Sequence, residues 1–121
     1  MLSPPLPRPL RIIFFRTEAG DEPAREWLKT LSSEDRKIIG EDLKTLQFRW
    51  PLGMPLVRPL DDKIYEVRTN LPHCIARALF FVHKEEIILL HGFIKKTRQT
   101  PPEELNLAKK RKHRHLAAYE E

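Results

Sequence analysis

The sequence predicts an α+β domain in which helices lie on one side of a small antiparallel sheet. Segments of strand and helix character follow in the order strand, two helices, three strands, helix, and only short turns separate the last three strands. Strands joined by short turns pair antiparallel, as a meander. Helices grouped on one side of such a sheet define the α+β class.

The length of the chain predicts one domain. Its 121 residues can bury a core without disulfides or a metal ion. We expect that domain at residues 10–121, after a flexible lead-in at residues 1–9. Four prolines fall in the lead-in from Pro4 onwards, and proline offers no backbone N–H to a helix or sheet.

The first strand and the first helix follow the lead-in. Arg11–Arg16 is apolar and β-rich, which is typical of a strand. Asp21 can cap the helix that comes next, and Pro23 suits its first turn. The apolar residues recur at helical spacing and form one face: Ala24, Trp27, Leu28 and Leu31.

A second helix is expected from a capping box. Ser32 and Asp35 have the spacing of that motif, and the apolar positions that follow keep a helical period as far as about Phe48. Pro51 and Pro55 end the helix, because proline also biases the preceding residue away from helical backbone.

The second half of the chain predicts the meander and a last helix. The expected strands cover residues 63–69, 74–83 and 87–94, and the helix covers residues 100–119. Strand side chains alternate between the two faces of a sheet. The middle strand therefore places one set of residues on one face, namely Ile75, Arg77, Leu79 and Phe81, and the opposite set on the other, namely Cys74, Ala76, Ala78, Phe80 and Val82.

Composition excludes several classes of protein. The single cysteine rules out an internal disulfide framework and fits a reducing cytosol. The longest uncharged apolar run, residues 87–93, is too short to span a membrane. The N-terminus lacks the basic and apolar regions of a signal peptide. We therefore expect a cytoplasmic protein without membrane contact.

Charge points to anionic partners. The chain has 22 Lys and Arg against 17 Asp and Glu, a net charge of +5. Three cations, Lys95, Lys96 and Arg98, directly follow the third meander strand and could clamp a phosphate. A second basic run, residues 109–115, could flank a nucleic acid; each run could also be a solvated surface.

Arg77 is a charged residue in the middle of an otherwise apolar strand. An arginine buried without a partner is costly. Two alternatives remain open: Arg77 forms a cross-strand ion pair with Glu66, or it points at an anionic ligand.

The five histidines show no spacing typical of a metal site, and the chain has no glycine-rich phosphate loop or nucleophile motif. We therefore expect neither a metal nor a cofactor.

A series of short motifs resembles the RelE/HigB-like toxins of type II toxin–antitoxin systems, in the branch related to phage-derived proteins. The resemblance covers roughly residues 10 to 116. Its parts, in order, are Leu-Gly at 52–53, Tyr-Glu-x-Arg at 65–68, Arg77, His-Gly-Phe-x-Lys-Lys-Thr at 91–97 and Thr-Pro at 100–101.

The resemblance implies a RelE-like fold and a metal-independent mRNA endoribonuclease that acts on the translating ribosome and inhibits translation. It implies a cognate antitoxin, often a helix-turn-helix protein encoded beside the toxin, through which operator DNA could be bound. By position it implies a basic active cleft lined by Arg68, Arg77, Lys95 and Lys96. Glu66 stands where some members have a basic residue, and His115 stands where many have a Tyr or another polar residue, so either of the two could transfer the proton. Further RNA contacts would come from Arg98, Lys109, Lys110, Arg111 and Arg114.

Two other functions are compatible with the same cations. A basic module could bind RNA or ribosomes without cutting, since phosphate affinity needs no catalysis. The chain could also be an inactive prophage remnant.

Overall fold

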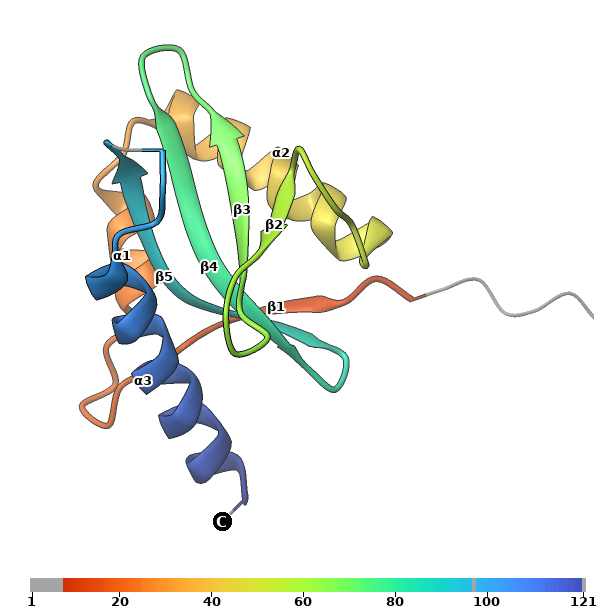
Figure 1. The fold of residues 1–121 in the computed structure, drawn as a ribbon, viewed down its shortest axis with the longest axis vertical. Helices are drawn as coiled ribbons and strands as arrows, with labels where there is room; N and C mark the ends of the chain where they lie inside the picture. The colour runs from red at the N-terminus through yellow and green to blue at the C-terminus, as the bar shows by residue number, and fades with distance from the viewer. Residues whose placement is uncertain (1–7, 97, 121) are drawn as a thin grey trace, which may run out of the picture.

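Five strands form one sheet in the order β1-β5-β4-β3-β2, flanked by three helices (Figure 1). The computed structural model describes residues 8–96 and 98–120. The predicted lead-in therefore lies largely outside the described residues. The strands are β1 (Arg11–Phe14), β2 (Val57–Pro59), β3 (Tyr65–Asn70), β4 (Ile75–His83) and β5 (Glu86–Lys95). The helices are α1 (Pro23–Lys29), α2 (Ser33–Arg49) and α3 (Pro102–Glu120).

The α+β class is confirmed, but the sheet is mixed rather than antiparallel. Strands β3, β4 and β5 form the predicted meander, with Tyr65 opposite Phe80 and Phe80 opposite Leu89. Strand β1 pairs with β5 in parallel, with Ile13 opposite Ile88. The pattern of β1 alone carries no information about its direction relative to a strand some 75 residues away. The short edge strand β2, which pairs with β3, was not predicted.

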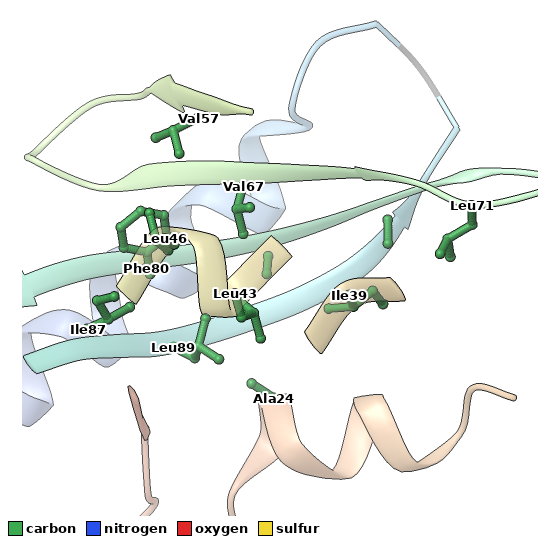
Figure 2. Packing of buried hydrophobic residues seen from close by; sticks show 12 residues of the cluster. Ala24, Ile39, Leu43, Leu46, Val57, Val67, Leu71, Phe80, Ile87 and Leu89 are labelled. Atoms are coloured by element: carbon green, nitrogen blue, oxygen red, sulfur yellow. The ribbon is translucent and has the colours of Figure 1, made fainter. Parts of the chain in front are cut away.

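The helices cover both faces of the sheet, so the expectation of helices on one side is wrong. Helices α1 and α2 pack on one face, where Leu43 and Leu46 of α2 lie beside Phe80 (Figure 2). Helix α3 packs on the other face, where Ala108 joins the second core cluster. The run Ile87–Leu90 of β5 is buried at every position, so both faces need a cover.

The side chains of β4 lie on the two faces of the sheet as strand alternation predicts. Leu79 and Phe81 lie in the α3-side cluster, whereas Ala76, Ala78 and Phe80 lie in the cluster under α1 and α2. The side chains of β4 therefore follow the period-two pattern along its length.

One predicted helix cap is confirmed and one is wrong. The Ser32 side chain accepts a hydrogen bond from the Asp35 backbone N–H at 3.1 Å, as the capping box requires. The N-cap of α1 is Glu22 instead of Asp21, and its side chain makes no cap hydrogen bond. The backbone N–H of Asp21 donates to Thr17 Oγ1 at 3.1 Å, which places Asp21 in the preceding turn.

A β-bulge changes the register in the middle of β5. Phe80 pairs with Leu89, but the preceding residue Leu79 pairs with His91, so Leu90 is the extra residue. Leu90 packs in the α3-side cluster, and His91 reaches Glu104 of α3. The bulge therefore places two consecutive side chains towards α3.

No helix within residues 8–96 and 98–120 is long and apolar enough to cross a membrane.

Candidate functional site

Glu66 and Arg77 form an ion pair that is fully buried under α3. Arg77 Nη1 lies 2.7 Å from Glu66 Oε1 and donates to Oε2 at 2.9 Å, and both side chains are 0% exposed. The two residues come from adjacent strands, since Arg77 lies opposite Arg68 and Glu66 lies opposite Leu79. Of the two alternatives for Arg77, the structure shows the cross-strand ion pair.

The same ion pair contacts the loop between β5 and α3. Arg77 Nη2 donates to the backbone carbonyl of Arg98 at 3.3 Å, and Nη1 donates to Thr100 Oγ1 at 3.3 Å. The Thr100 hydroxyl in turn donates to Glu66 Oε2. Within the described residues, Arg77 Nε has no hydrogen-bond partner, and the partner of Glu66 Oε1 is the charged Arg77 Nη1. The pair therefore joins two strands to one loop.

That loop carries the predicted phosphate clamp. Lys95 ends β5 and is half-buried, whereas the side chains of Lys96 and Arg98 are exposed. Among the described residues neither Lys96 nor Arg98 forms a side-chain ion pair. The backbone carbonyl of Arg98 accepts a hydrogen bond from the buried Arg77, whereas the side chain of Arg98 is exposed to solvent. Lys95, Lys96 and Arg98 can therefore offer three positive charges to an anion, and we call the segment that carries them the basic loop.

Arg68 lies opposite the fully buried Arg77 in the sheet, so the two side chains share one face of it. Arg68 is half-buried and borders a hollow of about 350 Å³ together with Asp42 of α2 and Asn70. Arg68 and Arg77 therefore do not converge on one open cleft.

A half-buried network that sequence reasoning missed connects β5 to α3. His91 Nε2 contacts the Glu104 carboxylate, and Arg111 Nη1 lies 3.4 Å from His91 Nδ1. Arg111 also donates to the Leu90 carbonyl at 2.8 Å. Burial lowers the pKa of Arg111, and the charge of Glu104 partly opposes that shift. In the sequence, His91 stands beside a glycine in a predicted strand, and this pattern alone does not indicate a contact between His91 and α3.

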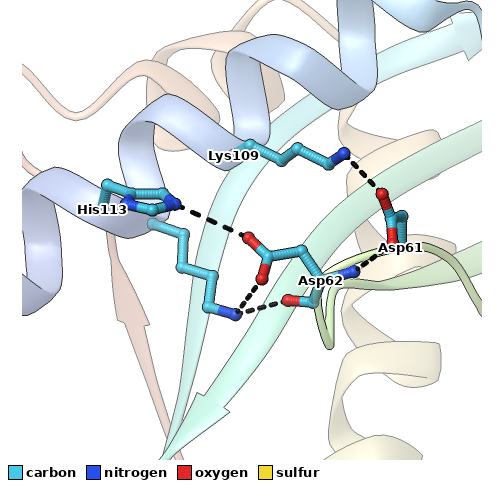
Figure 3. Close-up of polar contacts among 5 residues, drawn as sticks. Asp61, Asp62, Lys109 and His113 are labelled. Carbon is cyan, nitrogen blue, oxygen red and sulfur yellow. Dashed lines mark hydrogen bonds and ion pairs between the residues drawn. The ribbon is translucent and has the colours of Figure 1, made fainter.

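Much of the basic run on α3 is engaged within the protein. Lys109 contacts the Asp61 carboxylate at 2.6 Å, and His113 lies 3.7 Å from Asp62 (Figure 3). The hydrogen bond from Lys109 and the backbone N–H of Asp62 lower the pKa of Asp61. Lys112 reaches the same turn, with its Nζ 3.5 Å from Asp62 Oδ1.

The predicted RNA-binding residues of α3 therefore divide into two groups. Lys109 and Arg111 have partners inside the fold, since Lys109 pairs with Asp61 and Arg111 donates a hydrogen bond to the Leu90 carbonyl of β5. Lys110 and Arg114 are exposed and can meet an external anion.

His115 lies at the other end of α3 from the basic loop. Its ring packs against Phe81 and His83, with ring centroids 5.8 and 5.9 Å apart. It also lines a hollow of about 680 Å³ together with Arg114 and Arg16. Burial, followed by the charge of His83, lowers the pKa of His115, and Glu86 opposes the shift.

The β4 strand gives the distance between His115 and the loop. Lys95 pairs with Ile75, six residues before Phe81, and six strand residues span roughly 20 Å. His115 and Lys95 therefore cannot act on the same phosphate.

Within the described residues, no group of three or more His, Cys, Asp and Glu side chains could hold a metal ion.

The comparisons with known proteins yield one family. A family model described as "Phage derived protein Gp49-like (DUF891)" matches residues 26–113. These residues extend from the middle of α1 through strands β2 to β5 to the middle of α3, and they include the buried ion pair and the basic loop. No curated protein matches the chain.

Proposed function

This chain belongs to the Gp49-like family of phage-derived proteins, a family of RelE/HigB-like toxins of toxin–antitoxin systems, and from this premise we propose that it cleaves mRNA. The reaction proposed is a metal-independent cut on the translating ribosome, which would stop translation. The partners proposed are mRNA, the ribosome and a helix-turn-helix antitoxin, through which operator DNA would be bound.

The observation that carries the proposal is the basic loop after β5. Lys95, Lys96 and Arg98 lie within four residues, and two of these side chains are exposed. The loop is fastened to the sheet by a buried ion pair, which gives these cations a defined location. Arg68 lies on β3, two strands from β5, and could add a contact to a longer RNA.

Cleavage by the RNA's own 2′-hydroxyl suits such a set of cations. The 2′-hydroxyl gives its proton to water, its oxygen forms a bond to the adjacent phosphorus, and the bond to the 5′-oxygen of the next nucleotide breaks as that oxygen takes up a proton. Positive groups placed in advance stabilise the negative charge that develops on the phosphate oxygens. Lysine can also act in proton transfer. We assign charge stabilisation and protonation of the departing 5′-oxygen to Lys95 and Lys96.

The two residues first considered for proton transfer are poorly placed for it. Glu66 is fully buried and paired with Arg77. His115 lies roughly 20 Å from the loop along β4. The proposal therefore assigns neither of them a direct role in cleavage.

Mapping the 5′ ends of cellular transcripts after induction tests the proposal. We expect new ends with the wild-type protein, and about 10²–10³-fold fewer with Lys95→Ala/Lys96→Ala, by analogy with the loss of a transition-state donor. The matched control is Lys37→Ala/Lys44→Ala, which removes the same charge from exposed positions of α2.

Two results would contradict the proposal. Ribosome or RNA binding without new 5′ ends would make the chain a non-catalytic binding module. Full cleavage by the loop variant would place the active site elsewhere.

A further inference from the structure

The Glu66–Arg77 pair is built in a way that stability alone does not explain. A buried ion pair is often no more stabilising than apolar residues of similar volume, because both charges lose their hydration. Here the pair occupies a face of β4 whose other members, Leu79 and Phe81, are buried apolar residues. Apolar residues at the two positions would complete that face without any desolvation of charge.

The contacts of the pair extend to one further element, the loop. Arg77 donates both to the Arg98 carbonyl and to the Thr100 hydroxyl, and Thr100 donates to Glu66. Thr100 lies two residues before α3 begins at Pro102. The three polar groups therefore fix the end of the loop, between its cations and the helix.

Arg77 itself has no surface with which to touch RNA. Its side chain is 0% exposed, and Arg98 and Thr100 belong to the chain that covers it. A phosphate could reach the Arg77 guanidinium only if this cover moved away.

We propose that Glu66, Arg77 and Thr100 form a positioning lock: they do not contact RNA but hold the basic loop where Lys95, Lys96 and Arg98 can engage the phosphate. Glu66 supplies the charge that keeps Arg77 buried, and Arg77 supplies the donors for the loop. The inference rests on the proposed ribonuclease function, since the lock serves the cations of that site.

Thr100→Val is the sharpest test, because valine keeps the shape of threonine and removes only the hydroxyl. We expect cleavage of a model mRNA on purified ribosomes to fall about tenfold in kcat/KM, the usual effect of one lost hydrogen bond to a charged group. Thr100→Ser restores the hydroxyl and should restore the rate. Thr100→Ala is the second variant if valine disturbs folding.

The matched control is Thr45→Val on α2. The Thr45 hydroxyl donates to the Glu41 carbonyl within the same helix, far from the loop in the fold. Removal of this hydroxyl should leave the cleavage rate unchanged.

Hydrogen–deuterium exchange gives a readout that does not depend on activity. We expect the amides of residues 98–100 to exchange about tenfold faster in Thr100→Val than in the wild-type protein, with the amides of β4 unchanged. Exchange at residues 98–100 should return to the wild-type rate in Thr100→Ser.

The outcomes separate the two proposals. If the wild-type protein does not cleave RNA, the ribonuclease function fails, and exchange alone decides whether the lock exists. If the wild-type protein cleaves and Thr100→Val matches it in both rate and exchange, the lock is overturned. A slower rate with unchanged exchange also overturns it, because Thr100 would then act on the substrate.

Discussion

The two faces of the sheet differ in what they bury. Under α1 and α2 the sheet buries an apolar cluster that extends from Ala24 of α1 to Leu89 of β5, together with the uncharged Thr69. Under α3 the apolar cluster shares its face with the Glu66–Arg77 pair. The polar contact of His91 with Glu104 and the ring contact of Phe81 with His115 join the strands to the helix.

This difference sets a face held by apolar packing against a face that also holds charged groups. The face under α1 and α2 needs only shape and apolar area. The α3 face keeps charged groups in place through specific partners, and the basic loop is attached there.

Arg77→Ala should cause the largest loss of stability. It leaves the Glu66 carboxylate buried without its partner, which costs about 3–5 kcal/mol. Urea unfolding measures the loss, and Arg68→Ala on the neighbouring strand is the control, with an expected change of about 1 kcal/mol or less. The double variant Glu66→Leu/Arg77→Met should recover most of the stability. A loss below about 1 kcal/mol for Arg77→Ala would show that the pair does not hold this face together.

Gly92→Ala tests the opposite face through packing alone. An alanine Cβ at this position would overlap the six-membered ring of Trp27, so Trp27 or β5 must move. We expect a loss of about 1–3 kcal/mol, typical of overpacking. Gly40→Ala on α2 is the control, because its Cβ meets no atom within 4 Å and should stabilise the helix by about 1 kcal/mol. Equal thermal stability of the two variants would argue against close packing of Trp27 on β5.

His115 should make the α3 face sensitive to acid. Burial and His83 lower the pKa of His115 in the folded protein, so the unfolded chain binds a proton more readily. The stability is then complete above about pH 6.5, the ordinary value for histidine, and is lost as the pH falls below it. Unfolding curves at several pH values should show a shallower decline for His115→Gln than for wild-type. The exposed His73→Gln should behave like wild-type, and an equal slope in all three proteins would contradict the prediction.

Lys109→Ala should have the smallest effect. Its ion pair with Asp61 lies at the rim of the α3 face, where 71% of the Asp61 side chain is exposed. Water and salt screen such a pair, so we expect a small drop in Tm at low salt that vanishes in high salt. Lys110→Ala, an exposed neighbour on α3, is the control. A large loss that persists in high salt would mean that α3 depends on this contact for docking.

The local features of the fold were predictable, because their signals are short in range. The capping box at Ser32, the meander turns and the alternation along β4 involve neighbours a few residues apart. The possible pairing of Glu66 with Arg77 was also visible, since both residues occupy alternating positions on adjacent strands.

The arrangement of the candidate site was less predictable. The sequence placed His115 with the other site residues, but the length of β4 separates it from Lys95. The contact between His91 and Glu104 depends on the β-bulge at Leu90, and no local sequence pattern predicted this bulge. Lys109 and Arg111 are adjacent to exposed cations in the chain, and only the fold supplies their partners.

The order of the elements other than β2, the two sets of side chains on β4 and the cluster of cations after β5 could all be inferred from the sequence. These follow from periodicity and composition, which each segment carries alone. Only the tertiary structure decided that β1 runs parallel to β5, that α3 lies opposite α1 and α2, and that Arg77 is closed under the loop. The reason is that β4 and β5 bury side chains on both faces of the sheet, and the segments that cover these faces lie far away in the chain. The position of each covering segment depends on the packing of the whole molecule.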